Sequence, residues 1–384
     1  MRETWVAGAA SNRFGKMRES GRESGALVAR EALESAGVAA REIDYTFVAN
    51  AFGFAEGQAH VGPLLNTALG IPEVPSCTIE SACSSSSAAL HEAFVHVAGG
   101  FADAALVVGF EKLSHLDTLA ATSYFAMGAD APFEARNGAT FPGLYATIAS
   151  AHMHRYGTTP DQLGAVAVKN HANGARNPHA HFQKEISLAT HHDSPVIASP
   201  LRLYDCCPFS DGAVALVVVA REKFPRPSSE PLVVRASVRT GSHGDIHDRE
   251  DLTSLPASRE AARRAFAQAG TEPRALSFLE VHDCFTIAEL VALEDLGLFP
   301  PGQAGPATLE GVTARDGAVP VNPSGGLKAK GHPVGATGAS QVEEIFQQFN
   351  HRAGARQVPR VELALAHNVG ATGSSCSVHI FGHR

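Results

Sequence analysis

Apolar runs and amphipathic stretches alternate along this chain, and the alternation predicts its elements. Apolar runs predict strands at 104–108, 213–219 and 361–366, and the last two have few polar breaks, as expected for strands covered on both faces. Helical periodicity predicts helices over 84–97, 141–156 and 338–349. The pattern therefore favours an α/β protein in which mixed sheets are covered by helical layers.

Two segments of the chain repeat each other at an offset of 233 residues, which takes Gly37 to Gly270 and Phe52 to Phe285. In each segment a helical pattern ends at a glycine suited to cap a helix, and a strand pattern follows. Two alanine-rich helices can resemble each other by chance. The matched glycine, strand and Val-x-x-x-Phe ending nevertheless favour an internal duplication.

The duplication suggests where the chain divides. Residues from about 113 to 200 interrupt the strand order and are rich in His, Asn and Gly, so they are predicted to form an inserted loop lobe. The proline-rich stretch 224–231 is the predicted linker. We therefore expect an N-terminal half at 1–225, which includes the lobe, and a C-terminal half at 226–384.

Composition narrows the class of protein. The 384 residues are 44% hydrophobic, which allows a sizeable buried core, and the net charge of −8 argues against a nucleic-acid or anionic-membrane binder. The amino terminus shows no charged leader followed by an apolar stretch. No apolar run reaches the roughly 18 residues that a bilayer span needs. A cytoplasmic protein is expected.

Cysteine and histidine usage gives little support for a metal. The six cysteines include no Cys-x-x-Cys pair and are too sparse for a disulfide framework. Five histidines lie in one stretch, but their spacing fits no ligand pattern; they are His171, His179, His181, His191 and His192. No metal is predicted. The adjacent Cys206 and Cys207 are interpreted as buried thiols.

The segment around Cys83 carries the strongest chemical signal. A predicted strand leads through small residues to Ser81-Ala82-Cys83, and a helix begins directly after the cysteine. Backbone N–H groups and the positive end of the helix dipole would then face the sulfur and favour the thiolate. This environment suits a nucleophile. The alternative is a buried structural cysteine beside a serine that caps the helix.

A glycine-rich loop holds a second candidate. Residues 322–338 contain so many glycines that the backbone is expected to approach another group closely. His332 stands between Gly331 and Pro333, which fixes its backbone and aims its ring. Such a histidine can take a proton from a thiol or donate to a carbonyl oxygen. The alternative is a histidine that only closes a turn.

The order of three motifs resembles that of the thiolase superfamily. They are Ser81-Ala82-Cys83, His282-Asp283-Cys284-Phe285 and Gly331-His332-Pro333. The chain looks most like the branch related to sterol-carrier-protein-2 thiolases, in which His-Asp-Cys-Phe replaces Asn-Glu-Ala-Phe. The likeness extends over nearly the whole chain. It implies two similar βαβαβαββ halves in a five-layer αβαβα arrangement with a loop lobe.

The resemblance also implies roles for particular residues. Cys83 would be acylated by a coenzyme A thioester, His332 would accept its proton, and His282 would complete an oxyanion site for the second substrate. The amides of Cys83 and Gly370 would form the other oxyanion hole. Phe141, Pro142 and Leu144 are candidates to line the acyl pocket, although core packing explains them equally well.

One departure from ordinary thiolases concerns their second cysteine, which lies in a Cys-x-Gly-Gly-Gly motif near the end of the chain. Here that region begins with His367 and has fewer glycines. Cys284 is the predicted replacement as acid and base, and Cys376 is a second candidate. If neither serves, carbon–carbon chemistry becomes doubtful and simple acyl transfer remains.

These features predict an acyl-CoA C-acyltransferase that cleaves 3-ketoacyl-CoA or condenses acyl-CoAs, with a coenzyme A thioester as substrate and no permanently bound cofactor. The resemblance implies a homodimer or tetramer, and relatives sometimes pair with a small OB-fold, zinc-ribbon protein. The alternatives are a C-acyltransferase with a non-CoA acceptor, an acyl-CoA lyase, or a non-catalytic acyl-CoA or lipid-binding subunit. Acyl specificity and the direction of the reaction are not encoded in any motif.

Overall fold

A computed structural model describes residues 1–383. The first half of the core has the element order βαβαβαββ. Its elements are β1 (Thr4–Ser11), α1 (Gly21–Ala36), β2 (Tyr45–Ala49), α2 (Val61–Leu69), β3 (Ser76–Ile79), α3 (Ser85–Gly99), β4 (Ala104–Glu111) and β7 (Gly212–Ala220). Between β4 and β7 the chain leaves the sheet, and the predicted lobe interval of about 113–200 lies inside this excursion. It contains α4 (Thr118–Ala126), α5 (Phe141–Tyr156), α6 (Pro160–Gly174), α7 (Leu188–His192), β5 (Val196–Ala198) and β6 (Leu201–Arg202).

The second half repeats this order with one reduced strand. Its elements are β8 (Leu232–Gly241), α8 (Pro256–Ala269), β9 (Phe278–Glu280), α9 (Thr286–Asp295), α10 (Ala304–Leu309), α11 (Gly326–Ala329), α12 (Thr337–Phe349), β10 (Leu363–Gly370) and β11 (Ser375–Gly382). Where a third strand would stand, a single parallel bridge joins Val321 to Leu279. Pro320 and Pro323 flank this bridge, and because proline has no N–H the ladder cannot extend.

The two repeats fold alike where the sequence predicted it. Helices α1 and α8 end at Gly37 and Gly270, whose φ values of 68° and 63° are left-handed. In each repeat a short 3₁₀ turn follows, Ala40–Glu42 in the first and Pro273–Ala275 in the second, and then the strand β2 or β9. Glycine reaches this conformation without strain, which explains why both helices stop at this residue.

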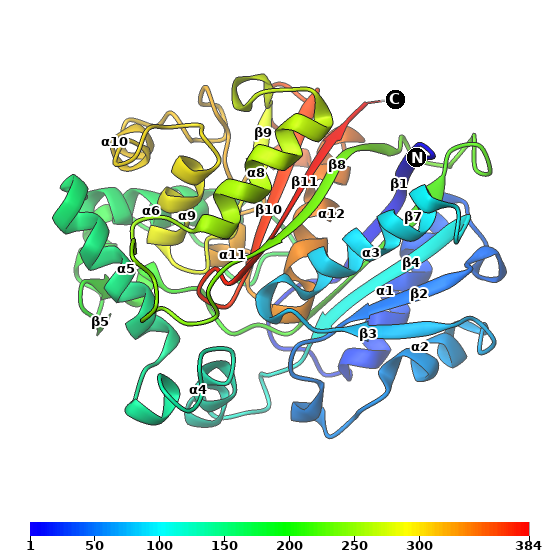
Figure 1. The fold of residues 1–384 in the computed structure, drawn as a ribbon, viewed down its shortest axis with the longest axis horizontal. Coiled ribbons are helices and arrows are strands. Elements are labelled where there is room, and N and C mark those ends of the chain that lie inside the picture. The colour runs from blue at the N-terminus through cyan, green and yellow to red at the C-terminus, as the bar shows by residue number, and fades with distance from the viewer. Residues whose placement is uncertain (384) are drawn as a thin grey trace.

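The strands form a layered core. Within residues 1–383, nine strands are joined in the order β3-β2-β4-β7-β1-β8-β11-β10-β9, and the two halves meet at the short β1–β8 pairing (Figure 1). Helices α1 and α2 pack on one face of the N-terminal strands, and α3 and α12 lie between the two sets of strands. Helix α8 covers the outer face of the C-terminal strands. These five layers confirm the predicted αβαβα arrangement.

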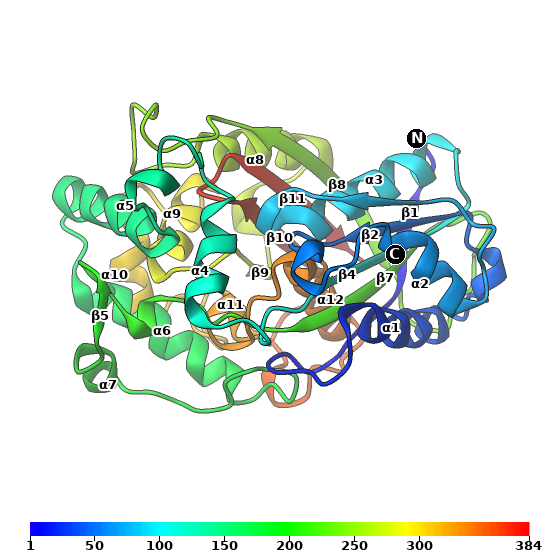
Figure 2. The same ribbon diagram turned by 90° about the horizontal axis from the view of Figure 1, so that it is seen from below.

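The lobe extends to one side of this core. Helices α5, α6 and α10 lie together at the left of Figure 1, while α4 lies at its lower edge and so comes to the front in Figure 2. The predicted linker 224–231 contains no helix or strand and joins β7 to β8. None of the helices described in residues 1–383 combines the length and apolar character that a bilayer span needs.

Candidate active site

Cys83 lies in a tight turn, Ala82–Ser84, between β3 and α3. Ala82 has a φ of 47°, an uncommon left-handed conformation for a residue with a side chain, and this bends the chain sharply before the cysteine. The Ser84 hydroxyl donates to the Ser81 carbonyl at 2.8 Å, and the Ser85 hydroxyl donates to the Ala82 carbonyl at 2.6 Å. The serines of the motif therefore fix the turn that presents Cys83.

The resting state of Cys83 differs from the sequence prediction. Burial raises the pKa of this thiol to about 12, although the N–H groups of Ala371 and Cys83 face the sulfur and lower it. The nearby Glu111 carboxylate adds to the rise. The expectation of a thiolate at the helix end was wrong because loss of solvent outweighs the two amides. Cys83 rests as a neutral thiol, so a base must take its proton.

His332 has the hydrogen bonds that such a base needs. The Thr337 hydroxyl donates its single proton to the Pro333 carbonyl at 3.0 Å. The contact of 2.7 Å between His332 Nδ1 and the Thr337 oxygen therefore requires Nδ1–H to be the donor. This tautomer leaves a lone pair on Nε2. Burial lowers the pKa of His332 to about 3, which keeps the ring neutral and able to accept a proton.

Replacing Thr337 with valine is expected to slow acylation of the enzyme by about tenfold to a hundredfold. The isosteric change leaves the buried Nδ1–H without an acceptor, a penalty of about 1–3 kcal/mol that favours the tautomer unable to act as a base. Stopped-flow measurement of thiol release from an acyl-CoA checks this. Thr337→Ser retains the hydroxyl and should acylate like the unsubstituted enzyme; equal rates for Thr337→Val would contradict the tautomer assignment.

His282 lies beside His332 and offers a proton where His332 offers a lone pair. Asn368 Nδ2 donates to His282 Nδ1 at 2.8 Å, so the proton of the neutral ring is on Nε2. Burial lowers the pKa of His282 well below its usual value, and the His332 ring lowers it further. Within the described residues, Nε2 of His282 has no hydrogen-bond partner. A buried donor without a partner is available to a substrate oxygen.

The thiol and the two imidazoles form one compact group. The Sγ of Cys83 and one ring nitrogen from each of His282 and His332 lie within 4.8 Å of one another, and all three residues are buried. The ring centroids of the two histidines are 5.4 Å apart at an interplanar angle of 84°. The structure therefore joins three of the predicted residues, which come from the turn before α3, the segment after β9 and the loop before α12.

These three residues also form a buried ligand set that could hold a soft metal ion. Two further groups in the described part of the chain are half-buried to exposed and mostly acidic; they comprise Asp130, His243, Asp245, His247 and Asp248. The histidine-rich stretch from 171 to 192 contributes to none of the groups found in residues 1–383.

Cys284 occupies a separate position near Cys83. Tyr145 forms a hydrogen bond to its thiol, and the Cys207 amide donates to the Cys284 carbonyl at 3.0 Å. Burial raises the pKa of Cys284 well above its usual value, and the neighbouring thiols of Cys207 and Cys83 raise it further. This thiol is therefore protonated at rest. Cys376, the second candidate, lies in β11 in the apolar core, where the Ser258 hydroxyl donates to its sulfur at 3.7 Å.

Gly370 ends β10 and packs against the turn that carries Cys83. A Cβ at this position would lie 2.6 Å from the Ser81 carbonyl oxygen, so only glycine lets the two segments approach. The next residue, Ala371, has a φ of 52° and directs its N–H toward the Cys83 sulfur. The Ala371 amide is thus one residue beyond the Gly370 amide that was predicted from the sequence. The oxyanion role of Gly370 stays a prediction.

A cavity of about 440 Å³ opens onto Cys83, Cys284 and His332. Its lining combines the reactive side chains with aromatic, aliphatic and threonine residues. The lining residues are Cys83, Thr118, Thr122, Phe125, Thr140, Phe141, Pro142, Ile197, Leu203, Cys206, Cys207, Phe209, Cys284, Phe285, His332 and Ala371. We call this space the active-site cavity. Of the three predicted pocket residues, Phe141 and Pro142 line it, whereas Leu144 is buried elsewhere on α5.

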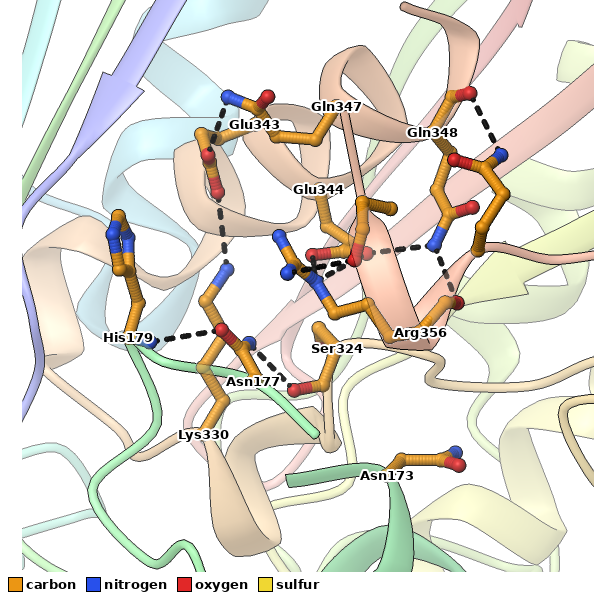
Figure 3. Close-up of polar contacts among 12 residues, drawn as sticks. Asn173, Asn177, His179, Ser324, Lys330, Glu343, Glu344, Gln347, Gln348 and Arg356 are labelled. Carbon is orange, nitrogen blue, oxygen red and sulfur yellow. Dashed lines mark hydrogen bonds and ion pairs between the residues drawn. The ribbon is translucent and has the colours of Figure 1, made fainter. Parts of the chain in front are cut away.

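Buried charges hold the loop that carries His332. Lys330 extends to the Glu343 carboxylate at 3.3 Å, and the Asn177 amide donates to the Ser324 carbonyl at 2.8 Å (Figure 3). Arg356 binds Glu344 of α12 at 2.8 Å in the same view. Because breaking a buried pair leaves an uncompensated charge, this network resists displacement of the loop.

The Asp283 carboxylate anchors the other end of this loop. It accepts from the amides of Leu327 and Lys328 at 2.6 and 3.3 Å, and from the Asn170 side chain at 2.7 Å. Asp283 therefore ties the segment between His282 and Cys284 to the loop of His332. Asn368 and Thr337, which set the two histidine tautomers, gave no signal in the sequence because each looks like an ordinary polar residue at the end of an element.

Two family models match nearly the whole chain. Residues 5–222 match the thiolase N-terminal domain, and residues 239–383 match the thiolase C-terminal domain-like family. The chain therefore belongs to the thiolase family, and it is a thiolase-type acyl-CoA acyltransferase. The resemblance inferred from the three motifs is confirmed.

Individual relatives agree with this assignment. An acetyl-CoA acetyltransferase of Methanothermobacter thermautotrophicus is 40% identical, with 99% of this chain and 100% of that protein covered. Sterol carrier protein 2 of Rattus norvegicus is 33% identical over 91% of this chain and 66% of its own length. Among solved structures, the Ltp2-ChsH2(DUF35) aldolase has a TM-score of 0.86 at 22% identity and covers 99% of this chain and 98% of that one. The last comparison supports the fold alone.

Proposed function

We propose that Cys83 forms an acyl-enzyme with a coenzyme A thioester and that Cys284 exchanges the proton beside the carbonyl in carbon–carbon cleavage or condensation. The observation that carries this proposal is the buried group of Cys83, His282 and His332 within 4.8 Å of one another, of which Cys83 and His332 line one cavity. Each member has the hydrogen-bonding state that its role requires: a thiol, a lone pair at Nε2 of His332 and a proton at Nε2 of His282.

The first step in the cleavage direction begins with both thiols protonated. His332 Nε2 takes the Cys83 proton while Sγ attacks the 3-keto carbon, and the negative charge passes to the keto oxygen. The amides of Cys83 and Gly370 are the proposed donors to this oxygen. The bond between carbons 2 and 3 then breaks, and its electrons form the enolate of the departing acyl-CoA. His332, now protonated, and His282 Nε2–H face the thioester oxygen of that enolate.

The remaining proton transfers restore the enzyme. Cys284 gives its proton to carbon 2, which releases the shortened acyl-CoA and leaves a Cys284 thiolate beside the protonated His332. The thiolate takes the proton of incoming coenzyme A, whose sulfur attacks the acyl group on Cys83. Collapse releases the Cys83 sulfur, which recovers its proton from His332. Condensation is the same sequence reversed.

The direct test is the mass of the intact protein and of its modified peptide after mixing with acetyl-CoA or with longer acyl-CoAs, in the absence of an acceptor. An acyl adduct on the peptide that holds Cys83 supports the proposal. Absence of an adduct with every thioester would contradict it, and it would favour an acyl-CoA lyase, a missing partner subunit or a non-catalytic binding protein.

A homodimer is part of the same proposal, supported by the edge strand β3. In the parallel pairing of β2 with β3, the Thr46 amide donates to the Pro75 carbonyl. Backbone groups of alternate residues of β3 face β2, and those of the residues between them face away. Pro75 faces β2, so the N–H of Thr78, three residues on, points outward. Thr78 is exposed, and no described strand pairs with this edge. An open edge with free backbone donors is a ready site for a second copy.

Thr78→Pro is therefore expected to convert the dimer to a monomer, because proline removes an outward N–H and leaves the bonds to β2 in place. Light scattering coupled to size exclusion measures the mass. Thr78→Val keeps the N–H and serves as the matched control. A proline variant that remains dimeric would place the interface elsewhere.

We also propose a cytoplasmic location, a coenzyme A thioester as substrate without a permanently bound cofactor, and halves at 1–225 and 226–384. The six cysteines are free thiols in the described structure, which suits a reducing compartment. A small OB-fold, zinc-ribbon partner is a further proposal, prompted by the two components that are joined in the name of the Ltp2-ChsH2(DUF35) aldolase, which shares this fold. Purification from the native host as a homodimer without other chains would count against that partner.

A further inference from the structure

One face of helix α4 forms a wall of the active-site cavity. Thr118, Thr122 and Phe125 all line the cavity, and their spacing of four and three residues places them on the same side of the helix. The opposite side faces solvent: Leu119 is 78% exposed, and Ser123 is also exposed. The two threonines are small, so this wall leaves space beside the single aromatic ring.

Aromatic rings connect this wall to the reactive groups. The Phe125 ring lies 4.7 Å from the Phe209 ring, 6.4 Å from the Phe141 ring and 6.5 Å from the His332 ring between centroids. Phe125 and Cys83 also belong to the same buried apolar cluster. An acyl group on the Cys83 sulfur would therefore contact Phe125 and continue along the face of α4.

The cavity lining carries no charge. Among the residues described, no Asp, Glu, Lys or Arg lines the cavity, and burial keeps its one histidine neutral. An acyl group with a free carboxylate would lose its hydration there without gaining a partner, which is costly. The lining instead favours an uncharged apolar group, whose burial is favourable in proportion to its area.

The size of the cavity argues for a large group. An apolar cavity of about 150 Å³ is enough to hold benzene. The active-site cavity measures about 440 Å³, and its exposed lining residues mark the mouth through which the pantetheine arm would enter; they are Thr118, Ile197, Leu203 and Phe209. An acetyl group on Cys83 would leave most of the inner space unfilled.

We propose that the acyl group carried by Cys83 is bulky, uncharged and apolar, either an aromatic ring or an alkyl chain of medium length, and that the Thr118, Thr122 and Phe125 face of α4 selects it. This inference rests on the proposed acyl-enzyme and specifies its substrate class. Thr122 is the specificity-determining position that distinguishes the proposal from general apolar binding, because a larger side chain there would fill the space that this face of α4 leaves for the acyl group.

The experiment measures second-order rate constants for acylation of Cys83 by intact mass, with acetyl-CoA, hexanoyl-CoA, phenylacetyl-CoA and succinyl-CoA. Hexanoyl-CoA and phenylacetyl-CoA are expected to react at least about tenfold faster than acetyl-CoA, and succinyl-CoA more slowly than hexanoyl-CoA. In Thr122→Phe, the ratio of the hexanoyl to the acetyl rate constant is expected to fall at least about tenfold.

Ser123→Phe adds the same ring to the adjacent, exposed residue of α4 and should leave that ratio unchanged. Acetyl-CoA reacting as fast as hexanoyl-CoA, or a ratio unaltered by Thr122→Phe, would overturn the inference while the acyl-enzyme stands. If none of the four thioesters forms an adduct, the proposed function fails and the inference fails with it.

Discussion

Replacing Cys83 with alanine is expected to lower turnover of a 3-ketoacyl-CoA by at least about 10⁴-fold and to abolish the acyl adduct. In the proposed mechanism the removed sulfur is the atom that attacks the carbonyl, and nothing else at this position can carry the acyl group. The small side chain should fit without strain, since Ala82 and Ser84 hold the turn through backbone and hydroxyl contacts. Steady-state kinetics and intact mass check the two effects separately.

Cys77 supplies the control for this experiment. It is a half-buried thiol on β3 and does not line the active-site cavity. Cys77→Ala should therefore keep both the adduct and the turnover. An adduct that persists in Cys83→Ala, or that disappears in Cys77→Ala, would show that another thiol is acylated.

Replacing Cys284 with alanine is expected to separate the two half-reactions. The adduct from acetyl-CoA should still form, because His332 and the amides around Cys83 remain in place. Carbon–carbon cleavage should fall by about 10³-fold, since the proposed donor of the proton to carbon 2 is removed. Burst kinetics with a 3-ketoacyl-CoA, together with the intact mass, measure the two steps.

Cys376→Ala is the matched control, because this thiol packs in the apolar core of β11 and does not line the cavity. It should cleave the substrate like the unsubstituted enzyme. Loss of cleavage in Cys376→Ala with retention in Cys284→Ala would reverse the assignment. Equal loss of adduct and cleavage in Cys284→Ala would instead point to a role in holding Tyr145 and the cavity wall.

The sequence predicted the framework because its signals are local. The glycines that end α1 and α8, the apolar runs of β7 and β10, and the order of the three motifs each depend on neighbouring residues alone. The layers follow from these signals, since buried strands and amphipathic helices have few ways to cover one another.

What the sequence did not predict depends on contacts between distant segments. Burial of Cys83 comes from Phe52, Leu113, Phe125 and Val334, and this packing raises its pKa where the local helix end alone would lower it. The orientation of α5 is another example. Phe141 and Pro142 reach the cavity at the start of that helix, while Leu144, further along it, is buried in other packing.

The unequal edges of the sheet limit how these molecules can assemble. At β9 the bridge through Val321 already occupies the outer side of the strand, and Pro320 and Pro323 have no N–H to donate to an added strand. Growth by strand addition is thus open at β3 and blocked at β9. A chain whose sheet has one open edge and one blocked edge can add only one further copy by strand pairing. Two open edges would allow fibres of unlimited length.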